Sequence, residues 1–196
     1  MGRVMVTKDH HVGRTVAMKV LLKGINSTAG EKRRFWTEVQ ATGQLEHPSI
    51  VPVYDVGHLD SGAPFYVMKH LSGETLSQIL DGLRRNDASV REKYPRIRLL
   101  TVFQQIAYAT AFAHARGIIH RDIKPSNIIV GNYGEAILFD WGLAKLVGEP
   151  SLDRLGSQER VRLSPDLKTG ETVNGVITGT PHYMSPEATQ GSSEIL

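Results

Sequence analysis

The first 71 residues alternate between strand-like and helix-like spacing of apolar positions. The run RTVAMKVLL at 14–22 predicts a buried strand, whereas apolar residues recur near helical spacing over 31–45 and stop before His47-Pro48. Two further apolar runs, 50–56 and 64–71, predict strands linked by the turn-rich LDSGAP. This part of the chain is therefore expected to form a small sheet accompanied by one helix.

From residue 72 onward the apolar spacing is mainly helical. We expect a short helix over 76–83 and a longer one over 96–116 that ends at Gly117, with the polar stretch 86–95 between them as a loop. The apolar stripe of the longer helix consists of Leu99, Phe103, Ile106, Thr110 and Ala113. Short strands over 128–130 and 136–139 follow, and regular spacing is lost over 148–174. This order predicts an α+β fold with the sheet first and the helices later.

Composition restricts the class of protein. A chain of 196 residues with 40% hydrophobic and 22% charged residues can bury a core as one domain or two small ones. No run of about eighteen apolar residues occurs, and the N-terminus lacks the apolar stretch of a signal peptide. The absence of cysteine excludes disulfides and thiolate metal sites and fits a reducing, cytoplasmic location. The net charge of +3 comes from dispersed basic residues, so no nucleic-acid partner is expected.

The segment HRDIKPSN at 120–127, followed by DWG at 140–142, carries the most specific chemistry in the sequence. Asp122 can orient an attacking hydroxyl or accept its proton, and Lys124 can offset charge on the γ-phosphate of ATP. Asn127 and Asp140 supply the hard oxygen ligands that Mg²⁺ prefers. Together these side chains provide what phosphoryl transfer from ATP to a hydroxyl requires.

These motifs resemble the catalytic loop and the metal-binding Asp of protein kinases, and the Lys-Pro after Asp122 is typical of the Ser/Thr branch. The resemblance extends from Gly2 to about Ala188. It is seen in particular to bacterial eukaryotic-type (Hanks-type) serine/threonine kinases, some of which carry Trp in the position of Trp141. It implies ATP and Mg²⁺ as cofactors, protein substrates with Ser or Thr acceptors, and self-association for autophosphorylation.

The same resemblance implies a two-lobed kinase-like fold. Residues 1–71 would form the N-lobe and hinge, and 72–196 a partial C-lobe that includes an activation segment over 140–187. Relatives often carry sensor, repeat or membrane segments beyond the kinase domain, so any membrane anchor is expected outside this chain.

At the nucleotide end, VAMK places Lys19 on a strand, where kinases use this Lys to hold the α- and β-phosphates. Glu38 matches the helical Glu that pairs with it, by its spacing to His47-Pro48. The resemblance further assigns a gatekeeper residue, two hinge residues that bond the adenine edge through their backbone, and three apolar residues that sandwich the ring. These are Met68; Lys69 and Leu71; and Val4, Ala17 and Ile129.

The glycine-rich loop is the main departure from the family pattern. Kinases use G-x-G-x-x-G to bring backbone N–H groups onto the phosphates. Here Gly2-Arg3-Val4 matches the tail of that motif, at the family distance from VAMK. We therefore expect the chain to be cut at its N-terminus. The family's supporting helix beyond the SPE motif is also expected to be missing, and with it most of the activity and solubility of these 196 residues alone.

The acceptor end resembles a long activation segment that closes with GTPHYMSPE. Thr180 matches the Thr that hydrogen-bonds Asp122 and Lys124. Arg121 and Lys145 match a pocket that binds a phosphorylated activation loop, because Arg–phosphate bonds are strong and often bidentate. The candidate acceptors in this segment are Thr172 first, then Thr169 and Thr178.

Two further points bear on the interpretation. Thr42 stands where most relatives have a Leu that stacks on the aromatic residue of DFG, here the larger Trp141. Two alternatives to a protein kinase remain open at this point. One is a pseudokinase or inert remnant that binds partners, and the other is a small-molecule phosphotransferase of related fold.

Overall fold

The N-terminal residues form a hairpin in which Gly2–Asp9 (β1) pairs antiparallel with Arg14–Leu21 (β2). The computed structural model describes residues 2–22, 27–146, 161–162, 164 and 179–189. The hairpin turn is held by the Asp9 carboxylate, which accepts from the backbone N–H groups of His11 and Val12. The strand β1 was not among the predicted elements. Its apolar side chains Val4 and Val6 are exposed, so no alternation of buried and polar positions marks the strand.

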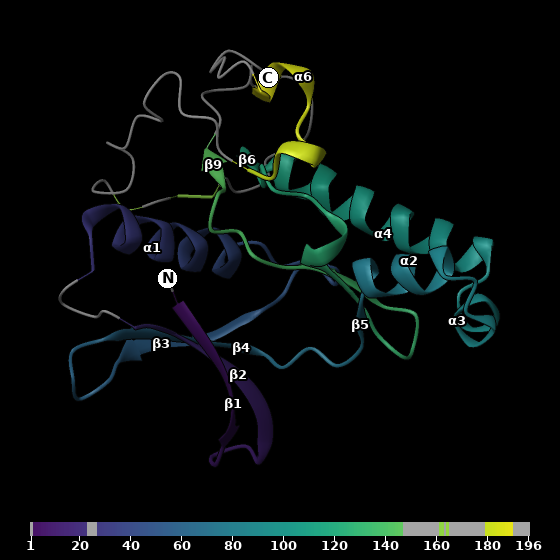
Figure 1. Cartoon of the computed structure of the whole chain (residues 1–196). Helices are drawn as coiled ribbons and strands as arrows, with labels where there is room; N and C mark the ends of the chain where they lie inside the picture. The colour runs from purple at the N-terminus through teal and green to yellow at the C-terminus, as the bar shows by residue number, and fades with distance from the viewer. Residues whose placement is uncertain (1, 23–26, 147–160, 163, 165–178, 190–196) are drawn as a thin grey trace.

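Val53–His58 (β3) and Pro64–Lys69 (β4) complete an antiparallel sheet in the order β1-β2-β4-β3. The helix Ala29–Gly43 (α1) lies along this sheet, as Figure 1 shows, and begins with a capping box between Thr28 and Glu31. Between helix and sheet lies a small apolar core of Leu21, Phe35, Val39 and Tyr66. The expected sheet with one helix is therefore confirmed.

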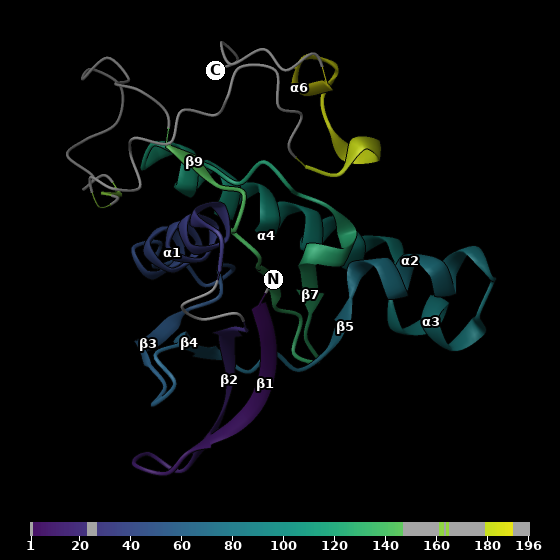
Figure 2. The same cartoon turned by 60° about the vertical axis from the view of Figure 1, so that its left-hand side comes forward.

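The second half of the chain is mainly helical, and Figure 2 shows its helices gathered on the side away from β1 and β2. Leu76–Arg84 (α2) and Arg96–Ala115 (α4) match the two predicted helices. Gly117 adopts a φ of 75° directly after the last turn of α4, which is the left-handed conformation of a glycine C-cap. In the described part of the chain, no helix has the length and apolarity needed to cross a membrane.

The prediction of a loop over 86–95 was wrong, because Ala88–Lys93 (α3) is a short helix. The Asp87 carboxylate accepts from the backbone N–H groups of Ser89 and Val90 and so caps the first turn. Gly82 leaves room for Val90 against α2: a Cβ on this glycine would lie 2.8 Å from Val90 Cγ2. The polar composition of this stretch obscured the capping Asp and the contact of half-buried Val90 with Gly82.

The predicted stripe of α4 was also wrong in part. The helix buries Val102, Ile106, Ala109 and Ala113 against the core, whereas Phe103 is 73% exposed. Successive residues of an α-helix point about 100° apart, so a stripe centred one residue earlier turns Phe103 out of the core.

Short strands form two further small sheets, β5-β7-β8 and β6-β9, among the described residues. They are Glu74–Thr75 (β5), Ile118–Ile119 (β6), Ile128–Val130 (β7), Ala136–Leu138 (β8) and Lys145–Leu146 (β9). β7 and β8 form the predicted hairpin, with β5 added at its edge. The backbone of Leu138 bonds to Ser49 and Val51, in the segment between α1 and β3, and so ties the two halves together. Three short helices complete the described elements, namely Pro125–Asn127 (η2), Pro181–Tyr183 (η3) and Pro186–Thr189 (α6).

Candidate active site

A buried ion pair links β2 to α1. Lys19 Nζ lies 2.6 Å and 2.7 Å from the two carboxylate oxygens of Glu38, and 4.0 Å from Asp140 Oδ1. Glu38 is only 6% exposed, and Tyr66 donates a third hydrogen bond of 2.7 Å to it. A buried carboxylate is costly unless it is paired and hydrogen-bonded, and here both conditions hold.

The residues expected around the nucleotide base line one cavity of about 380 Å³ between the sheet and β7. Val4 and Ala17 lie on the sheet side and Ile129 on the β7 side, so a flat ring can fit between apolar surfaces. The members of the expected set that line this cavity are Val4, Ala17, Lys19, Glu38, Met68, Lys69, Leu71, Ile129 and Asp140.

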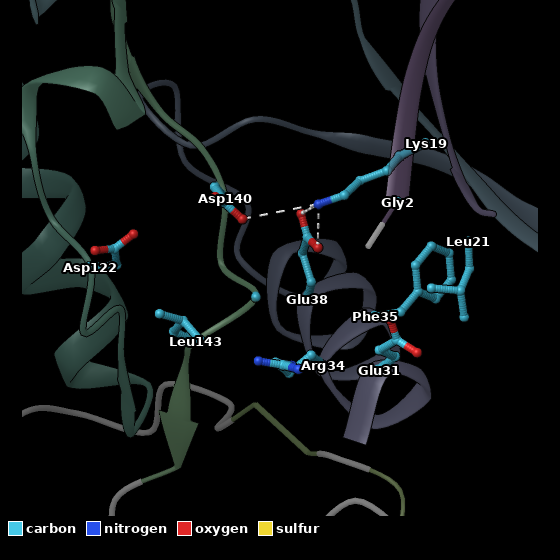
Figure 3. A pocket seen from close by; sticks show the side chains of 11 residues that line it. Gly2, Lys19, Leu21, Glu31, Arg34, Phe35, Glu38, Asp122, Asp140 and Leu143 are labelled. Atoms are coloured by element: carbon cyan, nitrogen blue, oxygen red, sulfur yellow. Dashed lines mark hydrogen bonds and ion pairs between the residues drawn. The ribbon is translucent and has the colours of Figure 1, made fainter. Parts of the chain in front are cut away.

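A second cavity of about 590 Å³ adjoins the Lys19–Glu38 pair and is drawn in Figure 3. Lys19 points from β2 toward Glu38, with Asp140 opposite, while Asp122 lies across the cavity from them. Gly2, the expected remnant of the glycine-rich loop, lines this cavity, and a Cβ there would lie 3.2 Å from Lys19 Cε. The two cavities share Lys19, Glu38 and Asp140, so base, phosphates and acceptor can occupy one continuous cleft.

The side chains of Asp122, Lys124 and Thr180 each contact the other two. Lys124 Nζ lies 2.7 Å from Asp122 Oδ2 and donates to Thr180 Oγ1 at 2.7 Å, while Thr180 Oγ1 donates to Asp122 Oδ1 at 2.7 Å. Burial would raise the pKa of Asp122, but hydrogen bonds from Lys124 and Thr180 outweigh it and lower the pKa below its usual value. The carboxylate therefore stays ionised and can accept a hydrogen bond from a hydroxyl.

The catalytic-loop backbone is held by His120. Its Nδ1 accepts from the backbone N–H of Asp122 at 3.2 Å, which leaves Nε2 to donate to the Phe139 carbonyl at 3.1 Å. Burial lowers the pKa of His120, against the opposing effect of the Phe139 carbonyl. The ring of Trp141 packs on this imidazole with centroids 4.6 Å apart. One neutral histidine thus links the loop to the DWG segment.

Asn127 and Asp140 are the donors that fit a metal ion. The Asn127 amide nitrogen donates to the Asp122 carbonyl and carboxylate at 2.9 Å and 3.0 Å, so its oxygen is the atom that can act as a ligand. The Asp140 side chain is 47% exposed at the cleft. Within the described residues, no group of three His, Cys, Asp or Glu side chains gathers as a metal site. An ion held here would take its other ligands from phosphates and water, as Mg²⁺ commonly does.

Arg121 and Lys145, the two residues of the expected phosphate pocket, both have backbone neighbours in this structure. Arg121 Nε donates to the Leu143 carbonyl at 2.7 Å, and Lys145 lies two residues further on, paired with Ile119 in the β6–β9 ladder. The three candidate acceptors, Thr172, Thr169 and Thr178, lie outside the described residues.

Tyr66 was missed by the sequence analysis, although a signal was present. It precedes Met68 by two residues on β4, and alternate residues of a strand share one face. Since Met68 was placed on the nucleotide side, Tyr66 belongs there too. The role of His120 in holding the Asp122 backbone had no comparable signal.

Residues 1–194 match the family described as "Protein kinase domain", and the chain belongs to this family. The expected membership and the expected two-lobed α+β fold are thereby confirmed. The match also favours a protein kinase over the small-molecule phosphotransferase considered above.

The chain is similar to bacterial serine/threonine kinases. "Serine/threonine-protein kinase PknD" of Protochlamydia amoebophila is 34% identical over an alignment of 203 residues that covers 97% of this chain and 20% of that protein. Proteins of the same name from Chlamydia caviae and Chlamydia pneumoniae are also 34% identical, over 98% and 97% of this chain and 21% and 20% of theirs. The chain therefore spans about a fifth of the length of these relatives.

Proposed function

We propose that this domain transfers the γ-phosphoryl group of ATP, in the presence of Mg²⁺, to Ser or Thr hydroxyls of protein substrates. One observation carries the proposal: Asp122, Lys124 and Thr180 are joined by three contacts of 2.7 Å at the edge of a cleft that also holds Lys19 and Asp140. Phosphoryl transfer depends mainly on positioning and on charge stabilisation, and these groups can supply both.

The proposed division of roles follows from the contacts. Asp122, ionised, orients the acceptor hydroxyl and takes up its proton, while Lys124 offsets charge on the transferred group. Lys19, held by Glu38, contacts the α- and β-phosphates. Asn127 and Asp140 hold Mg²⁺, which when bound offsets the charge of the phosphate oxygens. Met68, Lys69 and Leu71 border the adenine.

Asp122→Asn tests this function, because it removes the carboxylate while leaving the nucleotide contacts in place. We expect phosphate transfer from labelled ATP to fall at least about a hundredfold, with calorimetric affinity for MgATP nearly unchanged. Asp81→Asn is the control, since Asp81 is a surface carboxylate paired with Arg84. Transfer by the Asp122 variant at the control's rate would disprove the assignment. A domain that binds MgATP without transferring phosphate would favour the binding-module alternative.

We also propose that two copies associate for autophosphorylation on the activation segment, with Thr172 as the first acceptor. The support is the family pattern together with Arg121, which is already bonded to the backbone of that segment at Leu143. Mass spectrometry after incubation with MgATP tests this. Phosphate found only outside 148–180 would count against it.

A further inference from the structure

Two glutamines four residues apart, Gln40 on α1 and Gln44 as its C-cap, face a distant stretch of the chain. Gln44 Nε2 donates to the Arg162 carbonyl at 2.8 Å, and the Arg162 backbone N–H donates to Gln44 Oε1 at 2.8 Å. Gln40 Oε1 accepts from the Ser164 backbone N–H at 2.8 Å, and its Nε2 donates to Ser164 Oγ at 2.7 Å. These four bonds span 118 and 124 residues of sequence.

The spacing of the two partners explains why both glutamines can be satisfied. Residues four apart along an α-helix are separated by about 6 Å along its axis, so the two side-chain amides can reach separate residues of a neighbouring segment. Gln40 bonds to Ser164 and Gln44 to Arg162, so the partners follow in the opposite chain order. Each side-chain amide presents an acceptor and a donor, as a neighbouring strand would.

Most of this recognition is independent of side-chain identity on the later segment. Three of the four bonds reach backbone atoms, and only Ser164 contributes a side-chain atom. Gln44 Nε2 also donates to the Gln40 carbonyl at 2.8 Å, one turn earlier on the helix. The bond to the Gln40 carbonyl orients the Gln44 amide through a contact that does not involve Arg162.

Val161, one residue before Arg162, contacts the C-terminal end of a different helix, α4. The Val161 N–H donates to the Arg116 carbonyl at the end of α4 at 3.3 Å, and the Val161 side chain is 6% exposed within the main core. That core also contains Trp141 of the DWG segment. Residues 161, 162 and 164 thus join the end of α4 to the second half of α1.

The helix α1 also carries Glu38, two residues before Gln40, whose carboxylate holds Lys19. A helix moves largely as a unit, so a displacement of α1 that breaks the bonds of Gln40 and Gln44 also moves Glu38 away from Lys19. The four hydrogen bonds of Gln40 and Gln44 to Ser164 and Arg162 are called the amide clamp below. This clamp and the Lys19–Glu38 ion pair both attach α1 to other parts of the molecule.

We propose that Gln40 and Gln44 are positioning residues, which hold residues 162 and 164 against α1 and so couple the activation segment to the Lys19–Glu38 pair. The consequence for nucleotide binding rests on the function proposed above. The clamp itself rests on the contacts alone.

Amide hydrogen exchange measured by NMR on the chain tests the clamp directly. In the Gln40→Met, Gln44→Met double variant, the amides of Arg162 and Ser164 should exchange at least about tenfold faster than in the unchanged chain. Methionine keeps side-chain length and helix propensity while removing the amide. Gln104→Met is the control, because Gln104 is an exposed helical glutamine on α4 whose contact is with Tyr108. Equal exchange in the double variant and the control would overturn the proposal.

Two reciprocal measurements test the coupling. Lys19→Met, which leaves Glu38 with the Tyr66 hydrogen bond but no cation, should speed exchange at Arg162 and Ser164 without any nucleotide present. The double glutamine variant should bind MgATP about fivefold more weakly than the control. Faster exchange in the double variant with no response to Lys19→Met would overturn the coupling. If the unchanged chain binds no MgATP, the proposed function fails, while the two exchange experiments still decide the clamp and its coupling to Glu38.

Discussion

Tyr66 and Lys19 hold the same oxygen of Glu38, with hydrogen bonds of 2.7 Å and 2.6 Å to Oε1. Burial raises the pKa of the Tyr66 phenol, and the negative charge of Glu38 raises it further. The phenol therefore stays protonated and remains a donor throughout the physiological range. A buried carboxylate with a cation on one side and a phenol on the other has a fixed orientation, which is what a phosphate-binding Lys requires.

The first prediction concerns this phenol. Tyr66→Phe should lower the free energy of unfolding by about 1.5–3 kcal/mol, the usual range for a hydrogen bond to a charged group. Tyr54→Phe is the control, because the Tyr54 ring lies under Arg14 and its aromatic contact survives the change. Chemical denaturation measures both. Equal stability of the two variants would show that the Tyr66 bond adds nothing to the ion pair.

A second prediction uses a buried hydroxyl. Thr42 Oγ1 is buried and has no hydrogen-bond partner among the described residues, so Thr42→Val should raise the free energy of unfolding by about 1 kcal/mol. Thr110→Val makes the same chemical change where the hydroxyl donates to the Ile106 carbonyl at 2.8 Å, and should not stabilise. A destabilised Thr42 variant in the same denaturation assay would contradict this account.

A third prediction separates Lys19 and Asp140, whose Nζ and Oδ1 atoms lie 4.0 Å apart in the cleft. Under the proposed roles, Lys19→Met removes a positive charge from the phosphates, whereas Asp140→Asn removes a carboxylate ligand of Mg²⁺. Both should weaken nucleotide use, but the Mg²⁺ concentration needed for half-maximal MgATP binding should rise by about tenfold or more for Asp140→Asn alone. Superimposable Mg²⁺ titrations of the two variants would reject this division.

Thr180 provides a fourth prediction. Thr180→Val removes the hydroxyl between Lys124 and Asp122, so the pKa of Asp122 should rise and transfer should fall by about a hundredfold through misplacement. Because the Asp122 carboxylate is protonated as the pH falls through its pKa, a raised pKa should move the acid limb of the rate profile to higher pH. Thr180→Ser keeps the hydroxyl and should restore both properties. A serine variant as impaired as the valine variant would indicate a role for the methyl group instead.

The fifth prediction concerns pH and stability. His120 is buried as the neutral imidazole, and burial lowers its pKa below the ordinary 6.5. The unfolded chain therefore binds the proton more readily than the folded one, and stability is lost as the pH falls below about 6.5. The melting temperature should decline from pH 6.5 to 5, with a shallower slope in His120→Gln, whatever the variant's absolute stability. Identical slopes would exclude His120 as the cause.

The fold was largely readable where apolar spacing is strong. Apolar spacing marks the strand 14–21 and the helices around 76–84 and 96–115, although the buried stripe of the last helix was only partly predicted. The strand β1 was missed because it lies at the sheet edge with exposed valines. The helix α3 was missed because one capping Asp and a valine–glycine contact define it.

The residue types of the candidate site could be predicted from the sequence, whereas some of the contacts between them could not. Fixed local spacing marked Asp122, Lys124, Asn127 and Asp140, and the structure brings them to one cleft. Contacts that depend on the relative placement of distant elements could not be predicted from local spacing in the sequence. The Gln40–Ser164 and Gln44–Arg162 pairs are of this kind, separated by 124 and 118 residues.

Two non-glycine residues at the site adopt left-handed backbone conformations, Arg121 and Asp140, each with a φ of 65°. Such conformations cost about 1–3 kcal/mol each in a residue with a side chain. Glycine at either position would relax the backbone but delete a guanidinium or a metal ligand. Arg121→Gly and Asp140→Gly variants should therefore gain thermal stability while losing a charged side chain, so this site is assembled at the expense of backbone stability.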